Sequence, residues 1–393
     1  MPAMSRDQQQ HATAMIMAGV PSANMAIYHR IRFNVGDPVA WIGITAPGPA
    51  RSILIVRGIE LARARAHARA DEVHAPAEFE PASGLSGDRE TATAQALVEC
   101  LVREGIASVT ADRSLPLVYA EHVRQAGIEL QLDPELGLLD RRAKDQQEIQ
   151  WLQHAQSVTE GAMEMACGVI ARATPDSDGN LVHDGDLLTS ERVRMLIDAH
   201  LMEREFSNPL SIVAGGRQGF DCHEVGSGPL KVGQPVIVDI FPRDRRTLYN
   251  GDCTRTVVNG TPSDQLLRMH AAVLAAFDSA LAATRAGTTG EQVHAATVSA
   301  LESTGHGEHR VSGADAPDGP WLFHGTGHGV GLDVHEPPLL DWKGPELVPG
   351  DCLTIEPGLY SRELGGIRLE DMVIVQDGGC LNLNSLPKGL DWT

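Results

Sequence analysis

Cysteine pairs of the C-x-x-C kind are absent from this 393-residue sequence. Its six cysteines are scattered, which favours a reducing cytoplasm over a disulfide framework. No run of about 18 apolar residues occurs, and the N-terminus lacks a basic region followed by a long apolar stretch, so we expect neither membrane spanning nor secretion. Lys and Arg number 32 against 52 Asp and Glu, giving a formal charge of −20. Nucleic-acid and anionic membrane partners are therefore not expected.

The chain is longer than the roughly 250–300 residues that one hydrophobic core usually supports, so two domains are expected. Strand-like and helix-like patterns alternate within residues 53–132, which predicts an N-terminal α/β domain over residues 1–135. The stretch 133–140 has the composition of a linker. A second domain over residues 141–393 then gives an α/β (α+β) protein.

Apolar periodicity in the second domain predicts four helices, at 143–170, 189–205, 271–284 and 290–304. Thr189 or Ser190 is the candidate N-cap of the second helix. The polar segment 174–186 between the first two helices is interpreted as a surface loop.

Five potential metal ligands lie in three separated segments of the second domain: Asp239, Asp252, His328, Glu356 and Glu370. Four carboxylates and one imidazole suit manganese, cobalt or zinc, whereas several thiolates would favour structural zinc or an iron–sulfur cluster.

The acidic residues form two pairs, each flanking a predicted β-turn. A hairpin centred between Arg245 and Arg246 would make Asp239 and Asp252 cross-strand neighbours. A hairpin centred on Glu363 would do the same for Glu356 and Glu370. Facing carboxylates repel, so two such pairs call for a compensating cation. The alternative is two solvent-facing acidic hairpins.

The third segment, residues 323–336, contains three histidines and four glycines. Its glycine density argues against a regular helix and favours a backbone that lies close to a bulky group such as an ion or ligand. We interpret His328 as a ligand and His324 and His335 as auxiliary groups, since neutral imidazole binds metals and transfers protons near neutral pH. His223 is a further candidate.

Five blocks, taken in order, resemble the signature segments of the pita-bread metallopeptidases, a family that includes methionine aminopeptidase, aminopeptidase P, prolidase and creatinase. The blocks cover residues 238–239, 251–256, 324–336, 355–360 and 366–371. Residues 141–144 and 148–149 are also similar to the start of the catalytic domain in the prolidase and creatinase branch. The resemblance therefore spans residues 141–376 and implies a C-terminal pita-bread domain after a creatinase-like N-terminal domain that contributes to a homodimer.

The resemblance also implies roles for individual residues. Asp239 would chelate one ion, His328 and Glu356 the other, and Asp252 and Glu370 would bridge the two, with manganese favoured over cobalt or zinc. A bridging water would be the nucleophile and Glu356 its proton shuttle. His223 and His335 would act near the leaving amide, and the substrate-binding residues would be His324, Tyr360 and Arg368. The implied reaction is hydrolysis of short peptides at Xaa-Pro bonds by a dipeptidase or an aminopeptidase.

One departure from the family pattern lies between the first two ligands. The family usually has its two aspartates two residues closer together, and Phe241 stands where the family has glycine. A two-residue extension preserves the side-chain parity of a hairpin, so the ligand assignment is retained. We interpret the longer turn, with Pro242, Arg243, Arg245 and Arg246, as a solvated loop.

Two other classes of function are compatible with the sequence. One is a metal-dependent enzyme of the same fold that acts on a small non-peptide molecule. The other is a metal-free protein, either a creatinase-like hydrolase or a binding module, because a fold alone does not fix a function.

Overall fold

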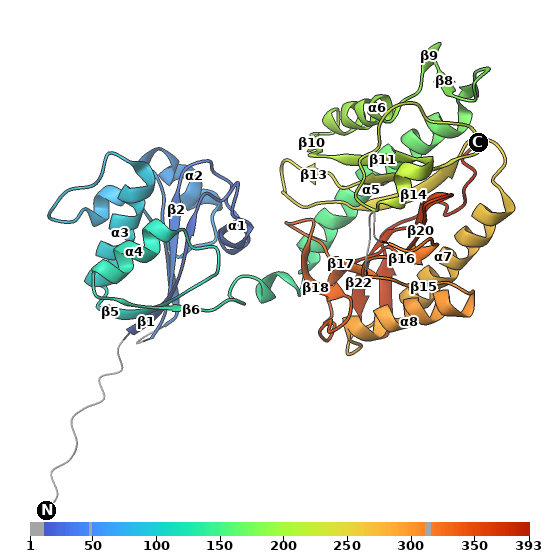
Figure 1. Cartoon of the computed structure of the whole chain (residues 1–393). Helices are drawn as coiled ribbons and strands as arrows, with labels where there is room; N and C mark the ends of the chain where they lie inside the picture. Colours follow the sequence, from blue (N-terminus) through green and yellow to red (C-terminus); the bar gives the residue numbers. More distant parts are fainter. Residues whose placement is uncertain (1–11, 47–48, 311–315) are drawn as a thin grey trace, which may run out of the picture. The chain divides into compact units, whose positions relative to one another are not determined.

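A computed structural model describes residues 12–46, 49–310 and 316–393. The chain divides into two compact units, Met1–Arg141 and Arg142–Thr393. Each unit combines helices with β-sheets (Figure 1), which confirms the predicted α/β (α+β) class.

The first unit has one six-stranded mixed sheet in the order β4-β3-β2-β1-β5-β6. Its parallel pairs are β3 with β4, β1 with β5 and β5 with β6, and the remaining pairs are antiparallel. The strands are β1 (Ala12–Gly19), β2 (Val39–Ala46), β3 (Arg51–Ile55), β4 (Glu72–His74), β5 (Ile106–Ala111) and β6 (Glu129–Leu132), and the helices are α1 (Met25–Ile31), α2 (Leu61–His67), α3 (Arg89–Arg103) and α4 (Leu117–Gln125).

Side-chain alternation along these strands supplies two buried layers. On β2, Ile42 packs into a cluster with residues of α3 and α4, whereas the adjacent Trp41 packs into a second cluster with residues of α1 and α2. Because successive residues of a strand point to opposite faces, both faces of the sheet are covered by helices.

The second unit contains four long helices outside several sheets (Figure 1). The helices are α5 (Gln146–Arg172), α6 (Ser190–Met202), α7 (Asp264–Ala283) and α8 (Gly290–Ser303). A three-stranded sheet holds β11 (Ser211–Gly215), β12 (Pro235–Ile240) and β14 (Cys253–Val258). A five-stranded sheet holds β17 (Gly327–Gly329), β18 (Glu336–Leu340), β19 (Cys352–Ile355), β22 (Asp371–Gln376) and β23 (Gly379–Asn382). A four-stranded sheet holds β15 (Gly307–Glu308), β16 (Trp321–Leu322), β20 (Gly358–Ser361) and β21 (Gly365–Arg368).

Two hydrophobic cores give this unit its two halves. One core joins α5 and α6 to β11, β12 and β14, and the other joins α7 and α8 to β19, β20, β21 and β22. Side-chain caps fix where the helices begin: Asp145 caps α5, Thr189 caps α6 and Thr289 caps α8. Helices on the outside and sheets on the inside are the pita-bread arrangement that the resemblance implies.

The hairpin of β12 and β14 is antiparallel as predicted, but the predicted register is wrong. Asp239 pairs with Thr254, not with Asp252. The turn lies one residue later in the chain because Asp244 organises it: its carboxylate accepts bonds from the backbone N–H of Arg246 and the hydroxyl of Thr247. A shift of two residues keeps the parity, so Asp252 still faces the same side as Asp239.

The second hairpin has the predicted register. Gly358 pairs with Arg368 in one sheet, and Ile355 pairs with Asp371 in the next. The two strand pairs follow the same register. Glu356 and Glu370 lie in the short break between the two sheets, and this register places them opposite each other. The two carboxylates therefore come from a point where the chain passes from one sheet to another.

Two segments expected to be loops contain short strands. Residues 174–187 form a three-stranded sheet of β7 (Thr174–Pro175), β8 (Leu181–His183) and β9 (Asp186–Leu187). The extended turn contains β13 (Arg243–Asp244), which pairs with β10 (Phe206–Ser207). Arg245 and Arg246 are exposed as expected. Pro242 is buried and Arg243 donates to the Leu332 carbonyl at 2.5 Å, so the solvated-loop interpretation is wrong for these two residues.

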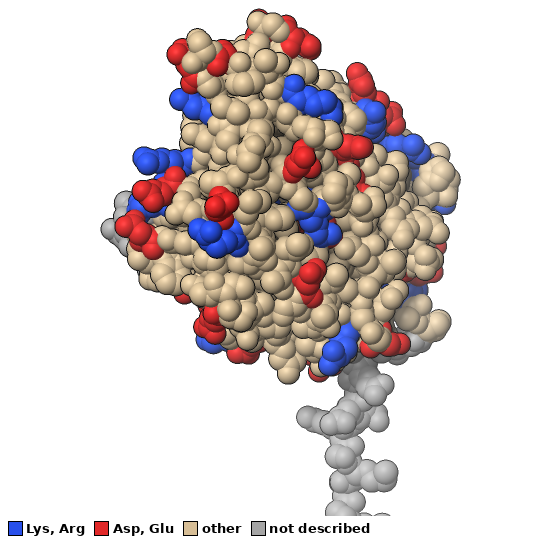
Figure 2. All heavy atoms as spheres, turned by 90° about the vertical axis from the view of Figure 1, so that its right-hand side faces the viewer, with Lys and Arg blue, Asp and Glu red and all other residues tan. Residues whose placement is uncertain are grey.

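Among the described residues, α7 is the one helix long and apolar enough to cross a membrane by length and composition. One face of it, including Met269, Val273, Ala276, Phe277 and Ala280, belongs to the hydrophobic core. We therefore interpret α7 as an amphipathic core helix. On the face drawn in Figure 2, basic and acidic side chains are interspersed among uncharged ones, so the acidic excess is not gathered into one patch there.

Candidate metal centre and substrate cavity

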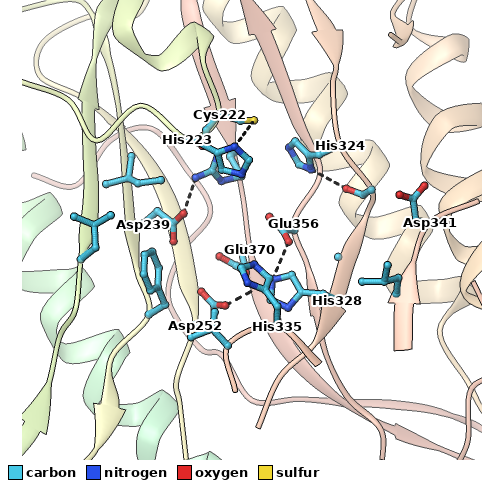
Figure 3. Close-up of a pocket in the computed structure, with 18 residues that line it drawn as sticks. Cys222, His223, Asp239, Asp252, His324, His328, His335, Asp341, Glu356 and Glu370 are labelled. Atoms are coloured by element: carbon cyan, nitrogen blue, oxygen red, sulfur yellow. Dashed lines mark hydrogen bonds and ion pairs between the residues drawn. The ribbon is translucent and has the colours of Figure 1, made fainter. Parts of the chain in front are cut away.

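A cavity of about 370 Å³ opens in the second unit, and the five predicted ligands all line it. They come from different elements: Asp239 from β12, Asp252 from the residue before β14, and His328 from β17. Glu356 and Glu370 come from the break between the sheets. Figure 3 shows the carboxylates of Asp239, Asp252, Glu356 and Glu370 pointing toward a common space, with the imidazole of His328 beside it.

The distances within this group are those of potential ligands to a shared ion. One ligand atom each from Asp252, His328 and Glu370 lies within 4.8 Å of the others. His328 Nε2 is 3.3 Å from Glu356 Oε1 and 3.9 Å from Asp252 Oδ2. His328 Nδ1 lies 3.0 Å from the carbonyl oxygen of Gly329, which leaves Nε2 toward the carboxylates.

Asp239 provides an observation that fits a cation. Its Oδ2 accepts a bond of 2.6 Å from Arg368 Nη2. Within the described part of the chain, its Oδ1 is buried and has no hydrogen-bond partner. A buried carboxylate oxygen without a partner is costly unless a positive group satisfies it. An ion held by oxygen and imidazole ligands fits this donor set.

Crowding shifts the acid–base properties of the carboxyl groups. Burial, together with Glu370 and Asp239, raises the pKa of Asp252 well above its usual range. Burial, together with Glu356 and Asp239, does the same for the pKa of Glu370. Burial raises the pKa of Glu356 to about 7, although the Arg368 guanidinium opposes the shift. Each shift has the direction expected when carboxylates share a dry site without enough positive charge.

Arg368 is the main positive group of the site. It is 3% exposed and lies on β21, two residues before Glu370. Its Nη1 donates to the carbonyl oxygen of Cys222 at 3.1 Å and contacts the Tyr360 hydroxyl at 3.0 Å. Its Nη2 donates to Asp239, so the guanidinium on β21 contacts Asp239 on β12, Tyr360 on β20 and the backbone at Cys222. This contact orients the Asp239 carboxylate.

The other predicted residues lie on the cavity wall or directly behind it. His223, His324 and His335 line the cavity, whereas Tyr360 is fully buried behind His324 and contacts its Nε2 at 2.7 Å. The rings of His328 and His335 meet edge to face at 4.3 Å between centroids. Burial and the nearby Arg368 lower the pKa of His324 to about 3, so this imidazole is neutral at physiological pH.

The glycines of the histidine segment allow its backbone to approach neighbouring strands. A Cβ on Gly327 would lie 2.0 Å from the Thr354 carbonyl oxygen, and one on Gly329 would lie 2.4 Å from the Glu336 carbonyl oxygen. Gly325 and Gly327 also line the cavity, so the backbone of this segment lies next to the space that an ion or ligand would occupy, and no helix forms there.

Two threonines that orient the carboxylates were missed in the sequence. Thr254 Oγ1 donates to Glu370 Oε2 at 2.7 Å. Thr354 Oγ1 donates to Glu356 Oε1 at 3.3 Å and accepts from the backbone N–H of His328 at 3.0 Å. A sequence signal existed, because each threonine lies two residues from a ligand and so shares its face of the strand.

Comparisons with known proteins agree with this geometry. The model of metallopeptidase family M24 matches residues 150–377. The uncharacterized peptidase YqhT of Bacillus subtilis is 34% identical over 181 residues, 46% of this chain and 47% of that protein. A Xaa-Pro dipeptidase of Pyrococcus horikoshii is 26% identical over 291 residues, 73% of this chain and 76% of that protein.

The fold also matches solved structures along its length. The X-Pro aminopeptidase of Thermotoga maritima superposes with a TM-score of 0.77 at 22% identity, covering 96% of this chain and 97% of that one. By contrast, the sequence alignments with the first curated relatives span about half the length of those proteins.

Proposed function

Because the chain belongs to metallopeptidase family M24, we propose that it is a hydrolase of short peptides that uses two divalent metal ions and cleaves Xaa-Pro bonds. The observation that carries the proposal is the convergence of four carboxylates and one imidazole on a single cavity, with a buried Asp239 oxygen that has no partner among the described residues. The same observation counts against a metal-free protein, because removal of the ions leaves these like charges uncompensated.

We assign the ions to Asp239, Asp252, His328, Glu356 and Glu370, with manganese as the favoured metal and cobalt or zinc as alternatives. When bound, two such ions polarise the scissile carbonyl and lower the pKa of a water nucleophile. The carboxylates differ in their protein partners: Asp239 is oriented by Arg368, Glu370 by Thr254 and Glu356 by Thr354. These bonds hold the side chains in place before ions or substrate arrive.

We assign the proton transfer to Glu356. Glu356 lines the cavity, and its Oε1 lies 3.3 Å from His328 Nε2, next to the other carboxylates. A carboxylate at this place can accept a proton from water and return it to the leaving nitrogen. His223 and His335 line the same cavity and are assigned to the leaving amide.

The groups that we assign to substrate binding lie next to the carboxylates, on the wall of the cavity or directly behind it. We assign this role to His324, Tyr360 and Arg368, which form one connected network. Since His324 is neutral, it offers the substrate a hydrogen-bonding imidazole and no added charge.

Two expectations about context belong to the same proposal. The six cysteines carry no disulfide among the described residues, in keeping with a reducing, cytoplasmic location. We also propose a homodimer, on the resemblance alone.

The proposal is tested by product analysis after manganese loading, with Gly-Pro, Gly-Pro-Xaa and Xaa-Pro-Pro as substrates. Hydrolysis of Gly-Pro alone identifies a dipeptidase, whereas release of Xaa from the longer peptides identifies an aminopeptidase. Absence of turnover with every peptide, in protein shown by elemental analysis to hold metal, would refute the peptidase proposal and leave a non-peptide substrate.

A further inference from the structure

Thr326, in the segment just before His328, holds the backbone of Glu356. The carbonyl oxygen of Thr326 accepts the backbone N–H of Glu356 at 2.8 Å, in the short break between β19 and β20. Thr326 is fully buried, and its own backbone N–H donates to the carbonyl oxygen of Leu340 at 2.7 Å. The position of Thr326 therefore determines where the Glu356 side chain begins.

The side chain of Thr326 is fixed by His294 on α8. The Thr297 hydroxyl donates to the carbonyl oxygen of Val293, and the Thr326 hydroxyl donates to Thr297 Oγ1 at 2.8 Å. With its only hydroxyl proton used in this way, Thr326 Oγ1 acts as an acceptor toward His294 Nδ1, which is 2.9 Å away. His294 therefore carries a proton on Nδ1.

The other ring nitrogen of His294 has partners of its own. Nε2 lies 3.1 Å from Arg310 Nη2 and 3.1 Å from Glu308 Oε1. Burial lowers the pKa of His294, although Glu308 opposes the shift, so the ring is neutral and Nε2 accepts from Arg310. Arg310 also donates to Asp341, which lines the cavity. The orientation of the His294 ring, which is 0% exposed, is thus fixed from both sides.

We infer that His294 is a positioning residue: its Nδ1–H group fixes Thr326 and, through the Thr326 carbonyl oxygen, the backbone of Glu356. The inference rests on the proposed function, in which Glu356 is a metal ligand and the proton shuttle. Thr326 also lies two residues before His328, so the same contact supports two of the assigned ligands. Mutation of groups that orient metal ligands typically costs about 10–100-fold in metal affinity or activity.

The test compares His294→Ala, which removes the donor, with His294→Asn, whose amide NH2 can replace the Nδ1–H group. We expect His294→Ala to lower kcat of the manganese-loaded enzyme for an Xaa-Pro peptide by about tenfold or more, with KM changed by less than about twofold. Isothermal titration calorimetry should show a manganese Kd raised by about tenfold. His294→Asn should retain most of both properties.

Thr326→Val tests the same contact from its other end. Valine has nearly the shape of threonine but a methyl group in place of the hydroxyl, so this variant should resemble His294→Ala. Each kcat is divided by the folded fraction measured by circular dichroism, so that loss of folded protein does not imitate the effect.

Thr284→Val is the matched control. Thr284 and Thr326 are each 0% exposed, and the Thr284 hydroxyl donates to the carbonyl oxygen of Ala280 at 2.8 Å, within α7 and its C-terminal cap. Its replacement should lower Tm without changing kcat or the manganese Kd.

Three results would overturn the inference. Unchanged kcat and manganese Kd in folded His294→Ala show that His294 is a core histidine without influence on the site. Equal losses in His294→Ala and His294→Asn show that the Nδ1–H group is not responsible. A loss in Thr326→Val alone shows that Thr326 acts without His294.

The proposed function can fail separately. If the manganese-bound wild type cleaves no peptide, the peptidase proposal falls, but the manganese Kd of the variants still decides whether His294 positions the ligands. Absence of manganese binding by the wild type removes both.

Discussion

Replacement of Asp252 by asparagine should stabilise the metal-free protein and weaken its response to metal. The Asp252 and Glu370 carboxylates belong to a group of ligand atoms within 4.8 Å of one another. If both groups were ionised, two unit negative charges at that separation would repel by about 3 kcal/mol at an effective dielectric constant near 20. The raised pKa of each group shows that the metal-free protein avoids this repulsion by taking up protons, which also costs stability at neutral pH. Asparagine has nearly the same shape but no charge. We therefore expect Asp252→Asn to stabilise the chelator-treated protein by about 1–3 kcal/mol, which raises Tm by about 2–10 °C for a unit of this size.

Manganese should narrow the difference in stability between the variant and the wild type. An ion present at about 100 times its Kd stabilises the wild-type protein by about 2.7 kcal/mol. The asparagine variant has lost a negatively charged ligand, so the same manganese concentration should raise its Tm by less than half as much. Differential scanning calorimetry with and without manganese measures both effects.

Asp244→Asn is the control for this experiment. Asp244 and Asp252 are each 3% exposed, but the Asp244 carboxylate accepts two bonds within its own turn. Loss of one acceptor charge there should lower Tm by a similar amount with and without manganese. The reasoning fails if Asp252→Asn lowers the Tm of the metal-free protein as Asp244→Asn does, or if both variants respond to manganese like the wild type.

Three further predictions follow from other contacts. Glu356→Gln should abolish peptide turnover while the far-ultraviolet circular dichroism stays native, and retention of most of the activity would refute its assignment as proton shuttle. Lys144→Ala should destabilise the second unit by about 3 kcal/mol, measured by urea unfolding, because it removes the buried ion pair between Lys144 and Glu336. Adding Glu336→Gln should recover much of this loss, and a cost below about 1 kcal/mol would contradict the argument. Arg243→Ala should reduce kcat more than it changes KM, because Arg243 donates to the Leu332 carbonyl in the turn before His335. Arg246 is exposed, so Arg246→Ala should change neither kcat nor KM. Equal effects of the two variants would show that the contact of Arg243 does not position the site.

The two hairpins show how far local sequence determines register. The turn between Glu356 and Glu370 is short, and its centre follows from the flanking β-branched and apolar residues. The turn between Asp239 and Asp252 is longer, and its centre depends on side-chain bonds of Asp244 and on pairing of β13 with β10. The bonds of Asp244 are local, but the pairing of β13 with β10 involves residues distant in sequence. Symmetry of the apolar pattern took account of neither and placed the centre one residue too early. The parity was still correct because strand side chains alternate with a period of two.

The sequence by itself determined the identity of the carboxylates and the imidazole, their grouping into pairs, and the face of each strand on which they lie, because these depend on residue type and on a local period. Only the tertiary structure decided that Phe241 joins Leu210 and Ile212 beside Asp239, and that Arg368 donates to Asp239. It also showed that the glycines near His328 accommodate neighbouring backbone. These relations join segments far apart in the chain, and they arise from packing of sheets and helices that no local pattern records.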